Sequence, residues 1–181
     1  PEMTYLDAIE LAYSGAQIIH PKTIKPLQNK NIPLYVRPFG DKFKPGSIVK
    51  GEMDHKIEIP ILIVKHNQVL LSIRPHDCSF VLEDRLASIF SLLEKYNAKI
   101  NMVQSSAVNL SVSVDVSRRL HEAVDELKAQ GFRVAYNDEM ELLTIRGYSQ
   151  ELYDRYGFGD DVFLTQKTRR TLRIVRKKHQ E

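Results

Sequence analysis

Three adjacent side chains, His76, Asp77 and Cys78, are of the types that bind metal ions or act as nucleophiles. A metal site needs three or four converging ligands, and the sequence offers no second cluster of such residues that could complete a site with this one. A nucleophilic cysteine needs a base or a positive environment to form its thiolate, and the spacing of the chain identifies no base. We therefore expect neither a metal site nor a catalytic residue in this chain.

The glycines give no sign of a phosphate-binding loop. Such a loop needs closely spaced glycines, because successive backbone amides must surround the phosphate. The 8 glycines of this chain are scattered and never form such a cluster. We therefore expect no cofactor to be bound by this chain alone, nucleotides included.

The C-terminal segment is rich in basic side chains, which could indicate nucleic-acid binding. Few aromatic residues are interleaved with these charges, however, and positive charges also keep the exposed edge of a hairpin from pairing with other chains. We interpret the segment as a solvated hairpin edge and expect no nucleic-acid partner. Its basic residues are Arg169, Arg170, Arg173, Arg176, Lys177 and Lys178.

The composition is that of a globular protein. The chain has 181 residues, of which 43% are hydrophobic and 27% charged, with a formal net charge of +3; this is enough to bury one or two ordinary cores. Its single cysteine cannot form an internal disulfide and suits a reducing compartment. No apolar run approaches the roughly 20 residues that cross a bilayer, and we expect no charged-then-apolar leader before the first helix. We expect a cytoplasmic protein without a membrane partner.

The first part of the chain carries the signals of two short helices and a strand. Thr4 and Asp7 have the spacing of a capping box, and the helix that they begin is expected to end at Gly15. Pro21 suits the first turn of a second helix, which Pro26 would kink or shorten. A strand at 34–36 follows, and residues 37–56, without a sustained period, are expected to connect to the next domain. The apolar residues at helical spacing are Leu6, Ile9 and Tyr13, then Ile24 and Leu27.

From residue 57 the pattern changes to the alternation typical of strands. The expected order is strand, helix, strand, strand, helix, strand, which closes as an antiparallel sheet with two helices on one face, the ferredoxin-like plan. A turn is expected at 66–68 between two runs of strand. Ser117 is expected to cap the second helix, which stops at Gly131. The predicted strands lie at 57–63, 69–73, 98–104, 108–114 and 132–136, and the predicted helices at 86–96 and 120–130.

Within this unit, Val108, Leu110, Val112 and Val114 alternate with polar residues, which predicts one buried and one polar sheet face. A second, shorter unit follows from residue 139, with a strand at 140–146, helical turns at 150–156 and a hairpin of 162–166 with 171–175. It lacks a final helix, so we expect it to complete its sheet beside the first unit. An RNA-binding domain of the same plan would need paired aromatic side chains on its central strands, which are absent.

The unbroken segment from Met3 to Ile24, together with Ile32-Pro33-Leu34-Tyr35-Val36, resembles the last conserved stretch of the aspartate kinase catalytic domain. In those enzymes two small regulatory domains of the ACT type follow, and ACT domains have the ferredoxin-like plan. The resemblance implies an α+β chain with three parts. Residues 1–55 would be the helical end of the amino-acid-kinase domain and a linker, 56–138 a first ACT domain, and 139–181 a truncated second ACT-like unit.

The resemblance also implies a function. The parent enzymes use ATP and magnesium to phosphorylate the side-chain carboxylate of aspartate, the first step towards lysine, threonine and methionine. This chain is then expected to be a regulatory fragment, inactive alone, that senses an end-product amino acid for feedback inhibition and forms a homodimer through its ACT domains. The alternative is a free-standing ACT-type module or regulatory subunit. Gln17 and Ile18 match positions that lie beside the nucleotide in the family, although Gln17 stands where the family has lysine.

In aspartate kinases the effector lies at the ACT dimer interface, between the loop after the first strand and the start of the second strand of the partner. Lysine-sensitive members usually carry acids where Asn101 and Ala107 stand here. Either lysine is held differently in this chain, through Glu83 or Asp84, or the effector is another amino acid such as threonine. The implied effector residues are Cys78, Ser79, Leu82, Arg85, Leu86, Lys99, Ile100, Asn101, Ser106 and Ala107.

Overall fold

The structure is a computed structural model that describes residues 2–16, 19–41, 43–51, 60–77, 80–81 and 83–178. It divides into two compact units. The N-terminal unit comprises Pro1–Val64, Thr144–Arg155 and Lys167–Leu172. The sheet unit comprises Lys65–Leu143, Tyr156–Gln166 and Arg173–Glu181. None of the helices in the described ranges has the length and the apolar composition that crossing a bilayer would take.

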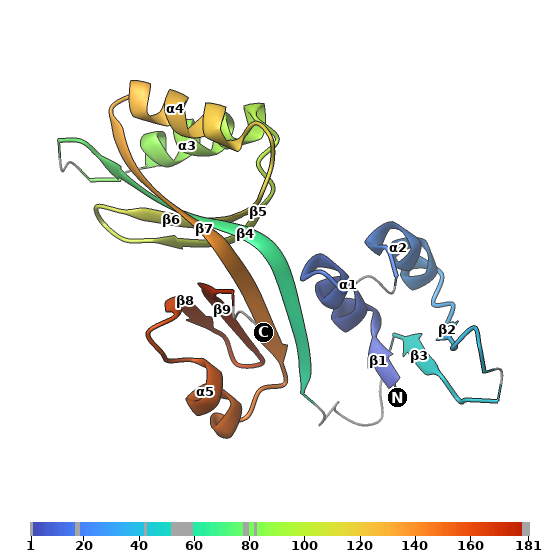
Figure 1. Cartoon of the computed structure of the whole chain (residues 1–181). Helices are drawn as coiled ribbons and strands as arrows, with labels where there is room; N and C mark the ends of the chain where they lie inside the picture. Colours follow the sequence, from blue (N-terminus) through green and yellow to red (C-terminus); the bar gives the residue numbers. More distant parts are fainter. Residues whose placement is uncertain are drawn as a thin grey trace. The chain divides into compact units, whose positions relative to one another are not determined.

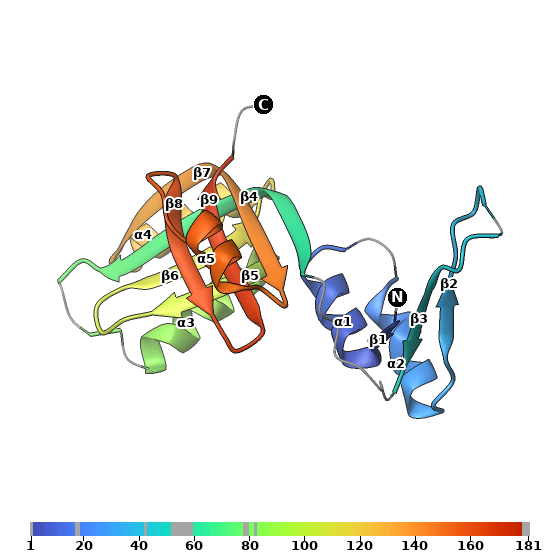
Figure 2. The same cartoon turned by 90° about the horizontal axis from the view of Figure 1, so that it is seen from below.

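The N-terminal unit begins with β1 (Glu2–Thr4), α1 (Tyr5–Tyr13), α2 (Pro21–Asn29), β2 (Leu34–Val36) and β3 (Ser47–Lys50). The predicted capping box is confirmed, since the Asp7 amide donates to Thr4 Oγ1 at 3.1 Å and the Thr4 amide to Asp7 Oδ2 at 3.4 Å. The strand order is β1-β3-β2, with β3 parallel to β1 and antiparallel to β2 (Figure 2). A small core of Tyr5, Ala8, Ile24 and Val49 lies between the helices and this sheet.

Two expectations for this unit are wrong. The buried face of α1 is formed by Tyr5, Ala8 and Leu11; of the predicted stripe, Ile9 packs against the small core, whereas Leu6 is 60% and Tyr13 57% exposed. Helical spacing identifies a stripe, but the stripe that packs here is the one that meets α2 and β3. The expected connection at 37–56 also contains β3, which is too short to show a period and exists because β1 and β2 supply backbone partners on both sides.

The sheet unit is built on the predicted plan. It contains most of β4 (Ile61–Pro75) and most of β7 (Phe132–Arg146), and between them α3 (Glu83–Lys95), β5 (Ile100–Ser105), β6 (Leu110–Asp115) and α4 (Leu120–Ala129). The helices α3 and α4 lie on one face of the sheet (Figure 1). Their apolar stripes pack on Val69, Leu71, Ile73 and the facing residues of β6, which forms the larger core. The ferredoxin-like arrangement expected from the sequence is therefore confirmed.

After α5 (Gln150–Tyr156), the strands β8 (Val162–Lys167) and β9 (Thr171–Lys177) extend the same sheet, whose order is β5-β6-β4-β7-β9-β8. The truncated second unit thus completes its sheet beside the first, as expected. Leu164 of β8 and Val175 of β9 share a second core with Leu70 and Met102. These two residues belong to the sheet face turned away from α3 and α4.

Three local expectations for the sheet unit are corrected. The face of β6 predicted to be polar and open is covered, and Ser113 is 0% exposed, because the second core lies over it. The turn expected at 66–68 is a continuous strand in which Asn67 alone has positive φ, 55°. Ser117 does not cap α4: Arg119 precedes the helix without a side-chain cap, and Ser117 Oγ has no partner. Ile57 and Ile59 of the first predicted strand lie outside the described residues.

Candidate functional site

Several predicted site residues lie outside the described residues: Gln17 and Ile18 for the nucleotide, and Cys78, Ser79 and Leu82 for the effector. The residues that flank the first pair, Ala16 and Ile19, line an apolar pocket of about 90 Å³ in the N-terminal unit. Its other lining residues are mostly small and aliphatic, from Met3 to Val49. Such a lining suits packing rather than phosphate binding, which requires donors or positive charge.

The turn between β5 and β6 holds one group of predicted effector residues. Ser106 and Ala107 are both exposed, and the turn is closed by the Ser106 amide, which donates to the Asn109 carbonyl at 2.8 Å. The Val81 amide donates to the Ala107 carbonyl at 2.8 Å. Val81, which precedes α3, is therefore held by its backbone against this turn.

Two predicted residues lie in the first turn of α3. Leu86 faces inward and packs against the larger core, so its side chain stabilises the fold. Arg85 faces outward, with Nη2 at 3.8 Å from Asp77 Oδ2, and its side chain is 36% exposed. Of this pair, only Arg85 offers a charge to a bound carboxylate.

The start of β5 holds the other group. Lys99 is exposed, and its carbonyl accepts from the Asp115 amide at 3.0 Å; Ile100 packs against the larger core. A register shift between Ile100 and Met102 leaves Asn101 as the extra residue of a β-bulge. Bulges redirect side chains, often next to functional sites. Asn101 is 5% exposed, and its side chain enters a polar network beneath the strands.

This network joins five side chains from β4, β5 and β6. Asn101 Nδ2 donates to Gln68 Oε1 at 2.8 Å and to Asp115 Oδ1 at 2.7 Å. Gln68 Nε2 donates to Asp115 Oδ1 at 2.7 Å, and Ser113 Oγ donates to Gln68 Oε1 at 3.1 Å. The fifth member is Lys65, whose Nζ lies 2.8 Å from Asn101 Oδ1 and 2.7 Å from Asp115 Oδ1. Each buried polar group in the network therefore has a partner, as a buried site requires.

The network also fixes the charge of Asp115. Burial alone would raise the pKa of this carboxyl, but the hydrogen bonds from Lys65, Gln68 and Asn101 and the charge of Lys65 outweigh it and hold the pKa below its usual value. Asp115 is thus a carboxylate beside an ammonium ion. Among the predicted residues, only Asn101 belongs to this network. The alternation of polar and apolar residues in β6 correctly predicts that its polar residues share one face of the strand. The pattern alone suggests that this polar face is exposed to solvent, whereas Ser113 on it is buried.

The two groups of predicted residues lie at opposite ends of β5. The five steps from Asn101 to Ser106 correspond to about 16 Å of extended chain. One free amino acid cannot contact both groups of the same chain. Among the described residues, the structure places Val81 next to the β5–β6 turn, and it separately places Asn101 in the polar network.

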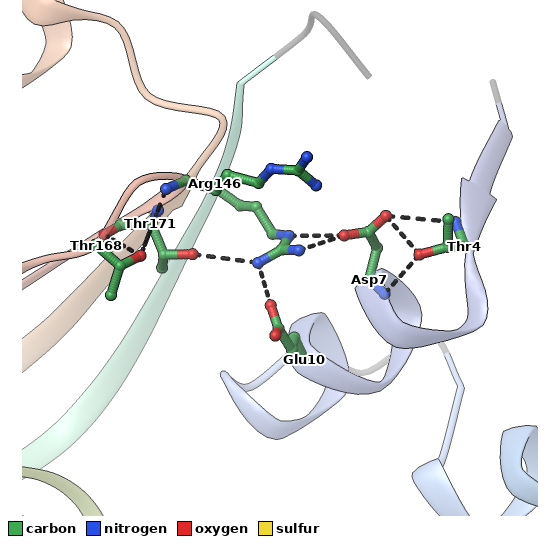
Figure 3. A network of polar contacts seen from close by, with 7 residues as sticks. Thr4, Asp7, Glu10, Arg146, Thr168 and Thr171 are labelled. Atoms are coloured by element: carbon green, nitrogen blue, oxygen red, sulfur yellow. Dashed lines mark hydrogen bonds and ion pairs between the residues drawn. The ribbon is translucent and has the colours of Figure 1, made fainter. Parts of the chain in front are cut away.

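A second polar cluster lies in the N-terminal unit, around Arg146 at the end of β7 (Figure 3). Its guanidinium lies between the carboxylates of Asp7 and Glu10 on α1 and bonds to both, with Nε at 2.9 Å from Asp7 Oδ1. Nη1 also donates to Thr171 Oγ1 of β9 at 3.2 Å. No motif in the sequence pointed to Arg146. We refer to Arg146, Asp7, Glu10 and Thr171 as the Arg146 clamp.

Asp7 has two roles in this clamp, because it is also the acidic member of the capping box of α1. Burial would raise the pKa of its carboxyl, but hydrogen bonds from Thr4 and Arg146 and the charge of Arg146 hold it below its usual value. The clamp thus ties the N-terminus of α1 to the end of β7 by a charged, partly buried contact. All of its charged groups are paired with one another, so it offers no free group for chemistry.

Within the described ranges, no three His, Cys, Asp or Glu side chains are grouped so that they could hold a metal ion. The two polar clusters instead consist of charges already paired with one another. Paired groups of this kind suit positioning and binding rather than proton transfer, which needs a group poised between two protonation states.

No model of a protein family matches the chain. Aspartokinase 3, chloroplastic, from Arabidopsis thaliana is 30% identical over 140 residues, which are 71% of this chain and 24% of that protein. The lysine-sensitive aspartokinase 3 of Escherichia coli is 26% identical over 172 residues, 90% of this chain and 37% of that protein. The chain thus spans between about a quarter and somewhat over a third of the length of these relatives.

Solved structures show the same fold. E. coli aspartokinase III in complex with lysine and aspartate has a TM-score of 0.77 at 21% identity, covering 96% of this chain and 42% of that one. Clostridium acetobutylicum aspartate kinase has a TM-score of 0.81 at 16% identity, covering 97% and 45%. The regulatory subunit of aspartate kinase from Thermus thermophilus has a TM-score of 0.51 at 10% identity, covering 67% and 89%.

These likenesses agree with the resemblance seen in the segment from Met3 to Ile24, and with the order of elements from β4 to β9. The chain is a homologue of the aspartokinases and matches a part of their sequence.

Proposed function

We propose that this chain is the amino-acid-sensing part of an aspartokinase, and that an end product such as lysine or threonine binds to its ferredoxin-like domain. The whole enzyme would use ATP and magnesium to phosphorylate aspartate. The chain itself would lack this activity, because no described segment offers a phosphate-binding loop or a group of metal ligands.

One observation carries the proposal. The likeness to E. coli aspartokinase III, solved with lysine and aspartate, extends over 96% of the chain, including the elements before β4 as well as the sheet unit. The alternative of a free-standing regulatory subunit is supported by the likeness to the T. thermophilus subunit, which covers 67% of the chain. A match that includes α1, α2 and the small sheet favours the first reading.

The separation of the two groups of predicted site residues supports a site shared between two copies. About 16 Å of extended strand separates Asn101 from Ser106, so a ligand held at the β5–β6 turn of one copy would need the start of β5 from another. Cyclic dimers with a self-complementary interface are the commonest homo-oligomers. We therefore include a homodimer through the sheet unit in the proposal.

The test is a binding screen of the purified chain with lysine, threonine, methionine and S-adenosylmethionine, followed by calorimetry. A ligand at 100 times its Kd should raise Tm by about 5–10 °C. In the variant Ala107→Trp the exposed turn is blocked, and the shift should be lost. The matched control is Ala129→Trp, which changes another exposed alanine, at the end of α4.

The proposal fails if none of the four compounds shifts Tm of the wild-type chain at millimolar concentration. It also fails for this site if Ala107→Trp and Ala129→Trp bind the ligand equally well. A separate assay with ATP, magnesium and aspartate should give no turnover above a heat-treated control, and clear turnover would show that the chain is itself a kinase.

A further inference from the structure

Lys65 occupies the centre of the polar network, although no sequence motif singled it out. Its Nζ lies 2.8 Å from Asn101 Oδ1, and 2.7 Å and 3.0 Å from the two oxygens of Asp115. Only 17% of its side chain is exposed. The ammonium ion therefore has three oxygen partners at hydrogen-bonding distance, which is the number of donors that it carries.

The oxygens that hold Lys65 are fixed by the rest of the network. Asp115 Oδ1 also accepts from Gln68 Nε2 and Asn101 Nδ2, both at 2.7 Å. The Asn101 amide is oriented by its bond to Gln68, so that its oxygen faces Lys65. These atoms form a preorganised cation position in a partly buried setting, where an unpaired carboxylate would be costly.

The same position contains Asn101, which the resemblance assigns to the effector site. We propose that Lys65 is a built-in ligand: its ammonium ion fills the cation position formed by Asp115 and Asn101, and thereby excludes a cationic effector side chain from this part of the site. This inference rests on the proposed function, which it deepens by assigning a specificity-determining residue. An effector whose side chain contacts Asp115 and Asn101 is then expected to have a neutral side chain, as threonine has.

The proposal has a consequence for Asn101. Changing it to aspartate would add a carboxylate next to Asp115 and Lys65, and Lys65 would remain the nearest cation. Asn101→Asp alone is therefore not expected to raise the affinity of the chain for free lysine. Removal of the Lys65 side chain is expected to raise it, because the ammonium group of a bound lysine can then replace the missing one.

Chemical rescue tests whether Lys65 fills such a position. Lys65→Ala removes the atoms of an n-propylammonium ion, and this probe should raise Tm of the variant by at least about 3 °C at saturating concentration. The neutral analogue 1-propanol should not. The matched control is Lys95→Ala, because Lys95 Nζ is also paired with a carboxylate, Glu126 Oε2 at 2.6 Å, but its side chain is 56% exposed.

Calorimetry tests whether Lys65 excludes a cationic effector side chain. The ratio of lysine to threonine affinity should rise at least tenfold in Lys65→Ala relative to wild type and Lys95→Ala. The inference is overturned if n-propylammonium stabilises Lys65→Ala no more than Lys95→Ala, or if the affinity ratio is unchanged. If no amino acid binds any of these proteins, the proposed function fails, while the n-propylammonium experiment still decides whether Lys65 fills a cation position.

A second measurement, on the wild-type chain, keeps the inference testable if Lys65→Ala does not fold. Acetylation by a water-soluble active ester, read by mass spectrometry, should modify Lys65 at least tenfold more slowly than the exposed Lys99. Asp115→Asn should accelerate the reaction of Lys65 without changing that of Lys99. Equal rates at Lys65 and Lys99 in the folded wild type would overturn the inference.

Discussion

At the scale of single residues, Arg146 links parts of the chain that are far apart in sequence. Its planar guanidinium bonds to two carboxylates and a hydroxyl through Nε, Nη1 and Nη2, in a rigid fork geometry that a lysine cannot reproduce. Both Arg146 and Asp7 are mostly buried, at 16% and 15% exposure of their side chains. Loss of Arg146 would leave the mostly buried carboxylate of Asp7 without its cation partner, which costs more than the loss of a surface pair.

We therefore expect Arg146→Ala to lower the free energy of unfolding by about 1–3 kcal/mol. Arg146→Lys, which keeps the charge but not the fork geometry, should lower it by less. The control is Arg118→Ala, which changes an exposed arginine before α4 and should cost less than about 0.5 kcal/mol. Urea titrations followed by circular dichroism measure the three variants. Equal stability of Arg146→Ala and Arg118→Ala would show that the clamp does not stabilise the fold.

The pKa values of Asp7 and Asp115 predict how stability depends on pH. Both are lowered in the folded chain from an ordinary value of 3.8. A lowered folded-state pKa contributes stability that is present above the unfolded-state value and is lost as the pH falls through the folded-state value. The urea midpoint of wild type should therefore decrease as the pH falls below about 4.

Asp115→Asn isolates one of these contributions. This variant should be less stable than wild type at pH 7, and the difference should shrink as the pH is lowered from 5 to 2, because protonation removes the same charge in wild type. Urea midpoints at four pH values suffice. A difference that is constant or grows towards low pH would contradict the assignment of a lowered pKa to Asp115.

At the scale of elements, β4 and β7 are each 15 residues long, and each contains one residue with positive φ. These residues are Asn67, with φ of 55°, and Glu139, with φ of 53°. Asparagine tolerates this conformation, whereas a glutamate in it is strained by roughly 1–2 kcal/mol. Glu139 is exposed, and its carbonyl accepts from the Lys178 amide at 2.9 Å, so tertiary hydrogen bonding holds the conformation in place.

Glu139→Gly should consequently increase the free energy of unfolding by about 0.5–1 kcal/mol, since glycine adopts positive φ without steric cost. Asp138→Gly is the control: the neighbouring residue is exposed and has no positive φ, so glycine there should destabilise by a similar amount. Thermal and urea unfolding of both variants give the comparison. Destabilisation of similar size in both would mean that the conformation of Glu139 is not strained.

These strands also show what could be predicted from the sequence. The sequence signals at 66–68 indicate a turn, yet β4 is continuous there, with Asn67 as its one left-handed residue. The predicted strands at 132–136 and 140–146 likewise form one continuous strand, β7, with Glu139 as its one left-handed residue. Local signals such as the Thr4–Asp7 capping box and Gly131 were interpreted correctly, because they depend on neighbours in sequence. The boundaries at 55 and 138 stay a prediction.

The candidate site was harder to predict for a related reason. Periodicity places Ser113 and Asp115 on one sheet face, but it does not say whether a second layer covers that face. Gln68, which lies on the same face, is expected from the sequence to belong to a turn. The cover comes from β8 and β9, distant in sequence. The Lys65 network and the Arg146 clamp are therefore visible only in the folded chain, and the effector positions stay a prediction.

At the scale of the whole molecule, the sheet ends in two edge strands, β5 and β8. The second half of β5 is exposed, and Val103, which lies there, is 36% exposed. Edge strands offer unpaired backbone groups to a second chain. The proposed effector site also requires residues of the β5–β6 turn and of the start of β5 from different copies. Both features favour assembly through this edge.

We expect the chain to form a homodimer, with a Kd in the micromolar range or below, through the β5 edge. Val103→Lys should weaken the dimer at least tenfold, because two like charges would face each other across a twofold axis. Ala129→Lys, on the surface of α4, is the matched control and should leave the dimer intact. Sedimentation velocity between 1 and 100 µM measures the Kd, and Tm of wild type should rise with protein concentration, since association stabilises the folded state. Monomers throughout that range, or equal effects of the two lysine substitutions, would exclude assembly through β5 and with it a shared effector site at this edge.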